Sequence, residues 1–208
     1  MVDTEALSPE KRAQILHGAA AVFDQDGYEG ASMSRIAAEA NVSKGTLYNH
    51  FTSKAHLFAA YVEQQCSRKL GHIFETIDGD DDPATTLRSV GTRMTQMMLS
   101  PTGLTIYRVV VSEAGKFPDL ARVFFDAGPA KAIRQLSTWL ERQARRGRLE
   151  VGDPQFAAEQ FFALCQTRVW MRCKLHLLPP PSPAEIDRVV DAAVRMFLRF
   201  YAAEEVPA

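Results

Sequence analysis

The sequence SKGTLYNHF, residues 43–51, decides the fold of the N-terminal part of this chain. Ser43 is a good helix N-cap, because its hydroxyl can accept a hydrogen bond from a free backbone N–H of the first turn. Leu47 and Phe51 lie one turn apart and can therefore point into one core. The polar residues between them then share the opposite face, which has no acidic side chain. Such a face suits the phosphates and base edges of a DNA groove.

The residues before this stretch complete a helix-turn-helix pattern. Ser32 can cap a short helix over residues 33–40, with apolar residues spaced for one buried face. Residues 41–43 make a tight turn, since asparagine tolerates the left-handed conformation. A further helix is expected over residues 8–27, because a Ser-Pro pair opens it and a glycine ends it. Three helices around one core are predicted for residues 8–51.

The remainder of the chain also predicts helices and no strands. The expected helices cover residues 54–77, 84–99, 104–115, 119–147, 154–176 and 183–203. An acidic turn is expected at residues 78–83 and a kink or junction at Gly128-Pro129. The predicted fold class is all-α. A three-helix head, residues 1–54, is joined by a long helix to a larger helical bundle, residues 55–208, that dimerises.

Residues 15–57 read ILHGAAAVFDQDGYEGASMSRIAAEANVSKGTLYNHFTSKAHL, and this text resembles the tetracycline-repressor (TetR/AcrR) family of bacterial regulators. Asn41 stands where the family usually has glycine, and Gly18 lies inside the first helix at a cost of roughly 1 kcal/mol against alanine. Residues 107–164 look more loosely like the AefR-like branch of C-terminal domains. The resemblance implies a DNA-binding transcriptional regulator that responds to a small molecule.

Candidate DNA contacts follow from the outward face and its flanks. They are Ser32, Ser43, Lys44, Gly45, Thr46, Tyr48, Asn49, His50 and Lys54. The outward face itself would dock in the major groove, while Ser32 and Lys54 hold phosphates. The family resemblance places Thr46 near base edges and Tyr48, His50 and Lys54 mainly on the DNA backbone.

The net charge of the chain provides little long-range electrostatic attraction to DNA. The net charge is −1, and residues 1–54 hold five Lys or Arg against seven Asp or Glu. Binding would therefore rest on a small local patch. A two-fold dimer would double the contact and match a pseudo-palindromic site with half-sites roughly one helical turn (~34 Å) apart.

The last two expected helices, residues 154–176 and 183–203, are apolar on more than one side. Two central core helices would explain this pattern, but an isologous four-helix interface between two copies explains it better. The resemblance implies the same interface. The candidate interface residues are Phe161, Trp170, Val190, Val194, Phe197 and Tyr201.

The middle of the chain is rich in methionine and aromatic residues. Ordinary core packing is the better interpretation for any single one of them. The family resemblance favours an apolar cavity with a few polar groups that orient a ligand. The candidate ligand-binding residues are Met94, Met97, Met98, Tyr107, Arg108, Phe124, Phe125, Trp139, Phe162 and Gln166.

Other classes of function find little support in the sequence. We find no nucleophile elbow, phosphate loop, metal spacing or evident acid/base pair, so no enzyme, catalytic residue, metal or cofactor is predicted. Three cysteines in 208 residues indicate a reducing cytoplasm, and no apolar run could span a membrane. The predicted partners are double-stranded DNA, a small-molecule effector and a second copy of the chain. The alternatives are a helical dimer that binds small molecules without operator function, or an enzyme that uses the apolar pocket.

Overall fold

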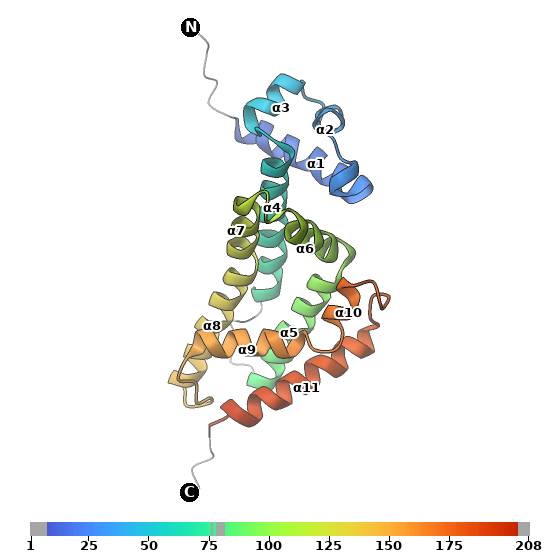
Figure 1. Cartoon of the computed structure of the whole chain (residues 1–208). Coiled ribbons are helices and arrows are strands. Elements are labelled where there is room, and N and C mark those ends of the chain that lie inside the picture. Colours follow the sequence, from blue (N-terminus) through green and yellow to red (C-terminus); the bar gives the residue numbers. More distant parts are fainter. Residues whose placement is uncertain (1–7, 76, 78–81, 204–208) are drawn as a thin grey trace, which may run out of the picture. The chain divides into compact units, whose positions relative to one another are not determined.

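The computed structural model describes residues 8–75, 77 and 82–203 (Figure 1). Most of these residues are helical, and Leu149 and Ala202 form an isolated antiparallel bridge. The expected all-α fold class is confirmed. The chain divides into two compact units, residues 1–67 with 105–127 and residues 68–104 with 128–208. None of the described helices is both long and apolar enough to cross a membrane.

The first unit contains the three predicted N-terminal helices. Its elements are α1 (Pro9–Gly30), α2 (Met33–Glu39), α3 (Lys44–His50), the beginning of α4 (Lys54–Phe74), most of α6 (Pro101–Glu113) and α7 (Pro118–Ala127). Ser8, Ser32 and Ser43 each accept a hydrogen bond from the backbone N–H three residues later, as expected of N-caps. The helix end predicted at Gly27 is instead a kink with φ 70°, after which the helical turn continues to Gly30.

The core of the first unit contains both predicted anchors of α3. Leu47 and Phe51 are 0% and 1% exposed and belong to one cluster with apolar residues of α1, α2 and α4. Ile106, Val110 and Leu120 join the same cluster from α6 and α7. The three-helix head therefore shares its core with residues of α6 and α7, which follow the head by about 50 residues or more along the chain. The functional division into residues 1–54 and 55–208 stays a prediction.

Gly18 lies at a close contact between α1 and Ala40, the C-cap of α2. A Cβ atom at this position would come within 2.7 Å of the backbone N and Cα of Ala40. Beside this contact, the side-chain amide of Gln14 donates a hydrogen bond of 2.7 Å to the Ala40 carbonyl. The glycine inside the helix is thus required by packing rather than merely tolerated.

Gly18→Ala is expected to destabilise the protein by roughly 1–3 kcal/mol, because the backbone of α2 must move to admit the methyl group. Glycine-to-alanine changes inside helices ordinarily stabilise by about 1 kcal/mol. Gly71→Ala in α4 is the matched control, since its Cβ would meet only the flexible Glu75 carboxylate at 3.9 Å. Urea unfolding of the two variants should therefore give shifts of opposite sign. A stabilised Gly18→Ala protein would contradict the packing argument.

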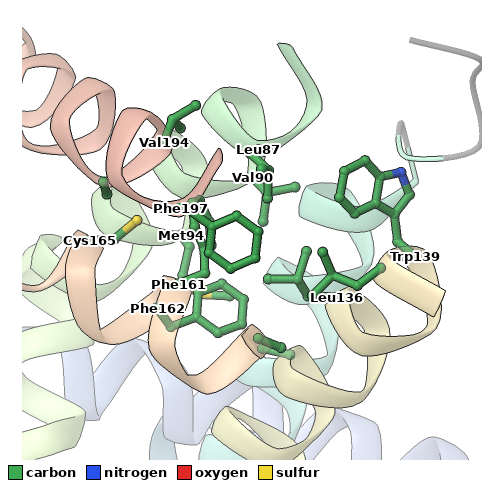
Figure 2. Close-up of a cluster of buried hydrophobic side chains, with 14 of the residues drawn as sticks. Leu87, Val90, Met94, Leu136, Trp139, Phe161, Phe162, Cys165, Val194 and Phe197 are labelled. Carbon is green, nitrogen blue, oxygen red and sulfur yellow. The ribbon is translucent and has the colours of Figure 1, made fainter. Parts of the chain in front are cut away.

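The second unit is a bundle around an aromatic and aliphatic core. It contains α5 (Pro83–Leu99), α8 (Pro129–Arg145), α9 (Pro154–Cys165), α10 (Trp170–Lys174) and α11 (Pro183–Tyr201). Figure 2 shows the core, where side chains of α5, α8, α9 and α11 converge. A Cβ on Gly91 of α5 would lie 2.9 Å from Cγ1 of Val190 and 3.2 Å from Cζ of Phe161. α5 and α11 are therefore packed without spare room.

One expected helix of the second unit is wrong in its extent. Residues 154–176 were predicted as a single helix, but α9 ends at Cys165 and α10 begins only at Trp170. Arg168 between them has φ 68°, a left-handed conformation that interrupts a helix. The predicted junction at Gly128-Pro129 does separate α7 from α8. Of the predicted acidic turn, residues 78–81 lie outside the described residues.

Candidate nucleic-acid interface

The turn between α2 and α3 has the geometry that the sequence predicts. Asn41 has φ 51°, in the left-handed region. The backbone N–H of Val42 donates a hydrogen bond of 2.9 Å to the carbonyl of Ala37, which closes the end of α2. Val42 itself is half-buried against the core of the first unit. The turn therefore fixes α3 relative to α2 through backbone contacts.

Helix α3 presents one exposed polar face. Lys44, Gly45, Tyr48 and Asn49 are exposed, and the Tyr48 side chain is 50% exposed. The opposite side of the helix carries the buried Leu47. No acidic residue lies on α3, so nothing on the helix itself repels phosphate. The structure thus brings these four predicted DNA contacts together on one surface.

Three other predicted contacts of the head, Ser32, Ser43 and Thr46, have hydrogen-bond partners within the protein. Ser32 and Ser43 cap α2 and α3. The hydroxyls of Ser43 and Thr46 lie 2.8 Å apart, which fixes the half-buried Thr46 side chain. His50 is half-buried, and its Nδ1 atom finds no hydrogen-bond partner among the described residues. Ser43, Thr46 and His50 therefore belong to the first and last turns of α3, whereas Ser32 belongs to the start of α2.

Lys54 lies in a different environment from the one predicted. Its ammonium donates hydrogen bonds to the carbonyls of Tyr28 at 2.7 Å and Ala31 at 3.1 Å. The same ammonium lies 4.4 Å from the centre of the Tyr28 ring. In this structure Lys54 is engaged by the protein itself rather than projecting toward solvent.

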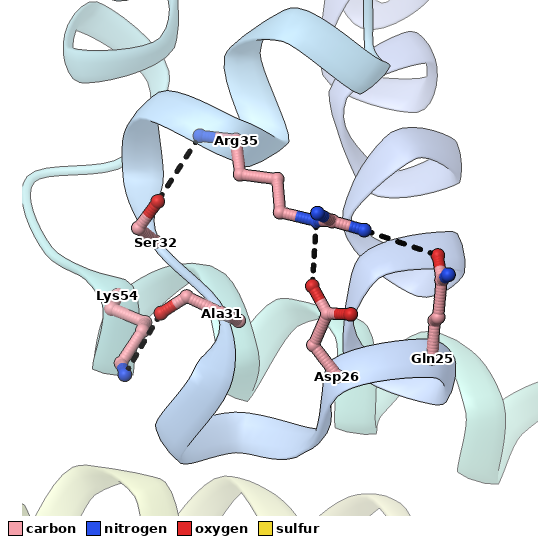
Figure 3. A network of polar contacts seen from close by, with 6 residues as sticks. All are labelled: Gln25, Asp26, Ala31, Ser32, Arg35 and Lys54. Carbon is pink, nitrogen blue, oxygen red and sulfur yellow. Dashed lines mark hydrogen bonds and ion pairs between the residues drawn. The ribbon is translucent and has the colours of Figure 1, made fainter.

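Three polar contacts around the head were not predicted from the sequence. Arg35 forms an ion pair of 2.6 Å with Asp26 and donates a hydrogen bond of 3.2 Å to Gln25 (Figure 3). The hydroxyl of Tyr61 donates a hydrogen bond of 2.8 Å to Asp24. All three tie the end of α1 to a neighbouring helix. The paired residues lie 9, 10 and 37 positions apart in the sequence, beyond the reach of helical spacing rules.

The predicted ligand-binding residues fall into both units. Tyr107, Arg108, Phe124 and Phe125 belong to the first unit. The others belong to the second unit, where Met94, Trp139 and Phe162 are buried in the core, Met97 and Met98 pack against it, and Gln166 ends α9. A surface hollow of about 540 Å³ in the second unit, lined by residues such as Arg148 and Leu198, includes none of them. The ligand site stays a prediction.

Most of the predicted interface residues lie inside the protomer. Phe161, Val190, Val194 and Phe197 are 0–2% exposed and form the core of the second unit. Trp170 and Tyr201 are half-buried. Within the protomer these four residues point into the core of the second unit, and their predicted role in a dimer interface stays a prediction. The large exposed side chains of these two helices are instead Phe156, Met196 and Phe200.

The three cysteines are free thiols. Cys66 is half-buried, whereas Cys165 and Cys173 are fully buried. Burial raises the pKa of the Cys165 thiol to about 12, so that this thiol stays protonated and unreactive at neutral pH. Among the described residues no group of histidine, cysteine and carboxylate side chains is placed to hold a metal ion. These observations favour core packing over a redox or metal site.

Comparison with known proteins identifies both parts of the chain. Residues 15–61 match the model of the tetR family of bacterial regulatory proteins, and residues 85–203 match the AefR-like transcriptional repressor C-terminal domain. The HTH-type transcriptional repressor KstR of Mycolicibacterium smegmatis is 28% identical over 192 residues, covering 91% of this chain and 87% of that protein.

Two solved structures extend this likeness to the fold. A TetR-family transcriptional regulator from Mesorhizobium loti superposes with a TM-score of 0.86 at 26% identity, covering 93% of this chain and 98% of that one. The Flavonoid-responsive Regulator FrrA superposes with a TM-score of 0.75 at 27% identity, covering 95% and 100%. These relatives are transcriptional regulators rather than enzymes. With its helix-turn-helix head and AefR-like C-terminal domain, the chain belongs to the tetR family and is a DNA-binding transcriptional regulator.

Proposed function

We propose that the chain is a repressor that binds a pseudo-palindromic operator as a homodimer and leaves it when a small apolar or amphipathic effector binds. The observation that carries this proposal is the exposed, acid-free face of α3, held in place by the buried Leu47 and Phe51. Side chains of the kinds found at Lys44, Tyr48 and Asn49 donate hydrogen bonds to phosphates and base edges. Similarity to the repressor KstR supports repression rather than activation.

A homodimer is proposed because one head offers few contacts. Helix α3 has seven residues, and the chain as a whole carries a net charge of −1. Two heads related by a two-fold axis would bind two half-sites and add their contacts. The exposed apolar side chains of α9 and α11 supply a surface of the kind that oligomer interfaces use.

An effector site in the second unit is supported by one unsatisfied polar atom. Trp139 is 1% exposed, and its indole N–H finds no acceptor among the described residues. A buried donor of this kind ordinarily has a partner. An effector with an oxygen acceptor on a mainly apolar body would satisfy it, and the relative FrrA is named as responsive to flavonoids. Binding would act by favouring a dimer whose heads no longer match the half-site spacing.

Tyr48→Ala is expected to weaken operator binding roughly 100-fold while leaving the fold and the oligomeric state unchanged. A hydrogen bond to a charged group contributes about 1.5 kcal/mol or more, and a dimer loses one per half-site. Gel-shift titration at fixed salt measures the change. Phe117→Ala is the matched control, because Phe117 is a similarly exposed aromatic residue of the same unit that does not lie on α3. Equal operator affinities of the wild type and Tyr48→Ala would show that Tyr48 does not contribute to DNA binding.

Selection of bound fragments from a random DNA pool tests the whole proposal. A palindromic consensus is expected, with half-sites about one helical turn, roughly 34 Å, apart. A consensus without symmetry would contradict the dimeric arrangement. The absence of any enriched sequence would instead favour a small-molecule-binding protein without operator function.

A further inference from the structure

Helix α8 carries two buried polar atoms that find no hydrogen-bond partner among the described residues. They are the indole N–H of Trp139 and the side-chain oxygen Oε1 of Gln135. Trp139 is 1% exposed, and the Gln135 side chain is half-buried with this oxygen shielded from solvent. Both residues belong to the second unit, in which the effector site is proposed.

A second glutamine of α8 shows that an unpaired amide oxygen is not a general property of this helix. Gln143 is 1% exposed, and its Oε1 accepts a hydrogen bond of 3.5 Å from the Arg148 guanidinium. Buried polar groups are ordinarily paired in this way, because an unpaired one has lost its water without compensation. The unpaired atoms of Gln135 and Trp139 are therefore a local feature that requires an explanation.

The two atoms have complementary chemistry and lie on one side of the helix. Gln135 and Trp139 are four residues apart, so their side chains leave α8 one turn from each other on the same face. The indole N–H can only donate a hydrogen bond, and the amide oxygen can only accept one. Figure 2 shows the indole nitrogen on the edge of the Trp139 ring that faces away from Phe161 and Phe197. The donor is therefore turned out of the aromatic centre of the core.

We propose that Trp139 and Gln135 together select an effector that carries an uncharged hydroxyl group on an apolar body, as a phenol does. The inference rests on the proposed effector response and names the chemical class of the effector. A hydroxyl oxygen accepts the indole hydrogen, and the hydroxyl hydrogen is donated to the Gln135 oxygen. One hydroxyl group thus pairs both atoms.

Other oxygen groups pair only one of the two atoms. A ketone or an ether accepts from Trp139 but has no hydrogen to donate, so Gln135 stays unpaired. A carboxylate has the same defect. In addition, its charge would have to lose water within the apolar cluster to which Trp139 belongs. The pair of atoms therefore favours a hydroxyl group over these alternatives.

The indole N–H signals in a nitrogen–proton NMR spectrum report the first of these hydrogen bonds. The chain has two tryptophans, Trp139 and Trp170, and the variant Trp139→Phe assigns their signals. Phenol is the probe, because it is a small hydroxyl compound that makes few demands on the shape of the site. Its addition to the isotope-labelled protein is expected to shift the Trp139 indole proton downfield. The Trp170 signal is the internal reference and should not move.

Anisole, in which a methyl group replaces the hydroxyl hydrogen, tests the second hydrogen bond. Phenol is expected to bind roughly tenfold more tightly than anisole, because anisole leaves the Gln135 oxygen unpaired. In Gln135→Leu this preference should disappear, while phenol still shifts the Trp139 signal. Ser137→Ala is the matched control, since Ser137 is a half-buried polar residue of α8 that faces away from both atoms, and it should keep the preference.

Two results would overturn the inference. A Trp139 signal that stays in place up to the highest phenol concentration that leaves the protein folded would show that no hydroxyl reaches the indole. Equal binding of phenol and anisole to the wild type would show that Gln135 takes no part. Operator binding is decided separately by the DNA selection, which uses the wild-type protein without any small molecule, so the two proposals can fail independently.

Discussion

Unfolding of the second unit is the expected result of replacing Val190 by glutamate. Val190 is 0% exposed. Its Cγ1 atom packs so closely against Gly91 that a Cβ added to this glycine would lie only 2.9 Å away. The site has no room for a longer side chain. The residues packed there, Gly91, Cys165 and Phe161, are uncharged and offer a carboxylate no cationic partner. An unpaired carboxylate buried there costs several kcal/mol. That cost is comparable with the 5–15 kcal/mol that stabilises an ordinary domain.

Tryptophan fluorescence measures this outcome, because both tryptophans of the chain, Trp139 and Trp170, belong to the second unit. Emission of Val190→Glu should shift to the red as the buried Trp139 meets water. Val190→Ala should remain folded and lose roughly 2 kcal/mol of stability. Arg188→Glu places the same charge at an exposed position of α11 and should fold normally. A folded, monomeric Val190→Glu protein would instead show that Val190 contributes to the dimer interface.

Local patterns predicted the head well because its geometry depends on neighbouring residues. Ser43 caps α3, Asn41 adopts the left-handed conformation, and Leu47 points inward, all as expected. Each of these features is decided within about four residues of sequence. The polar face of α3 follows from them, so its exposed residues could be named from the sequence.

The features that the sequence did not predict depend on distant contacts. Lys54 finds its carbonyl partners 23 to 26 residues earlier in the chain. Ile106 and Val110 pack in the core of the head although they follow it by about 50 residues. Helical periodicity identifies apolar faces but does not say which partner each face meets.

Helix α11 shows this limit most clearly. It is apolar on more than one side, and the sequence pattern alone favoured Val190 and Phe197 as interface residues. The structure buries these two within the protomer and exposes Met196 and Phe200. When two faces of a helix are both apolar, only the packing of the other helices decides which one becomes core.

The double variant Met196→Glu, Phe200→Glu is expected to convert the proposed dimer into folded monomers. Phe200 is 78% exposed and Met196 is 60% exposed, and they lie one turn apart on α11. Phe156, in the first turn of α9, is 53% exposed and adds to the apolar surface of this pair of helices. Carboxylates at the centre of an apolar interface would have to lose water without gaining partners.

Sedimentation equilibrium would show the halved mass, and an unchanged unfolding midpoint of the protomer would show that the core is intact. Phe117→Glu is the control, since it adds a charge at a 40% exposed aromatic residue of the other unit and should leave the mass unchanged. Operator affinity should fall by about 10²- to 10⁴-fold with dissociation, because linked heads bind the second half-site at high effective concentration. A variant that stays dimeric would exclude this face of α11 from the interface. A monomer that keeps full affinity would show that each head reads DNA alone, which the net charge and the short α3 make physically unfavourable.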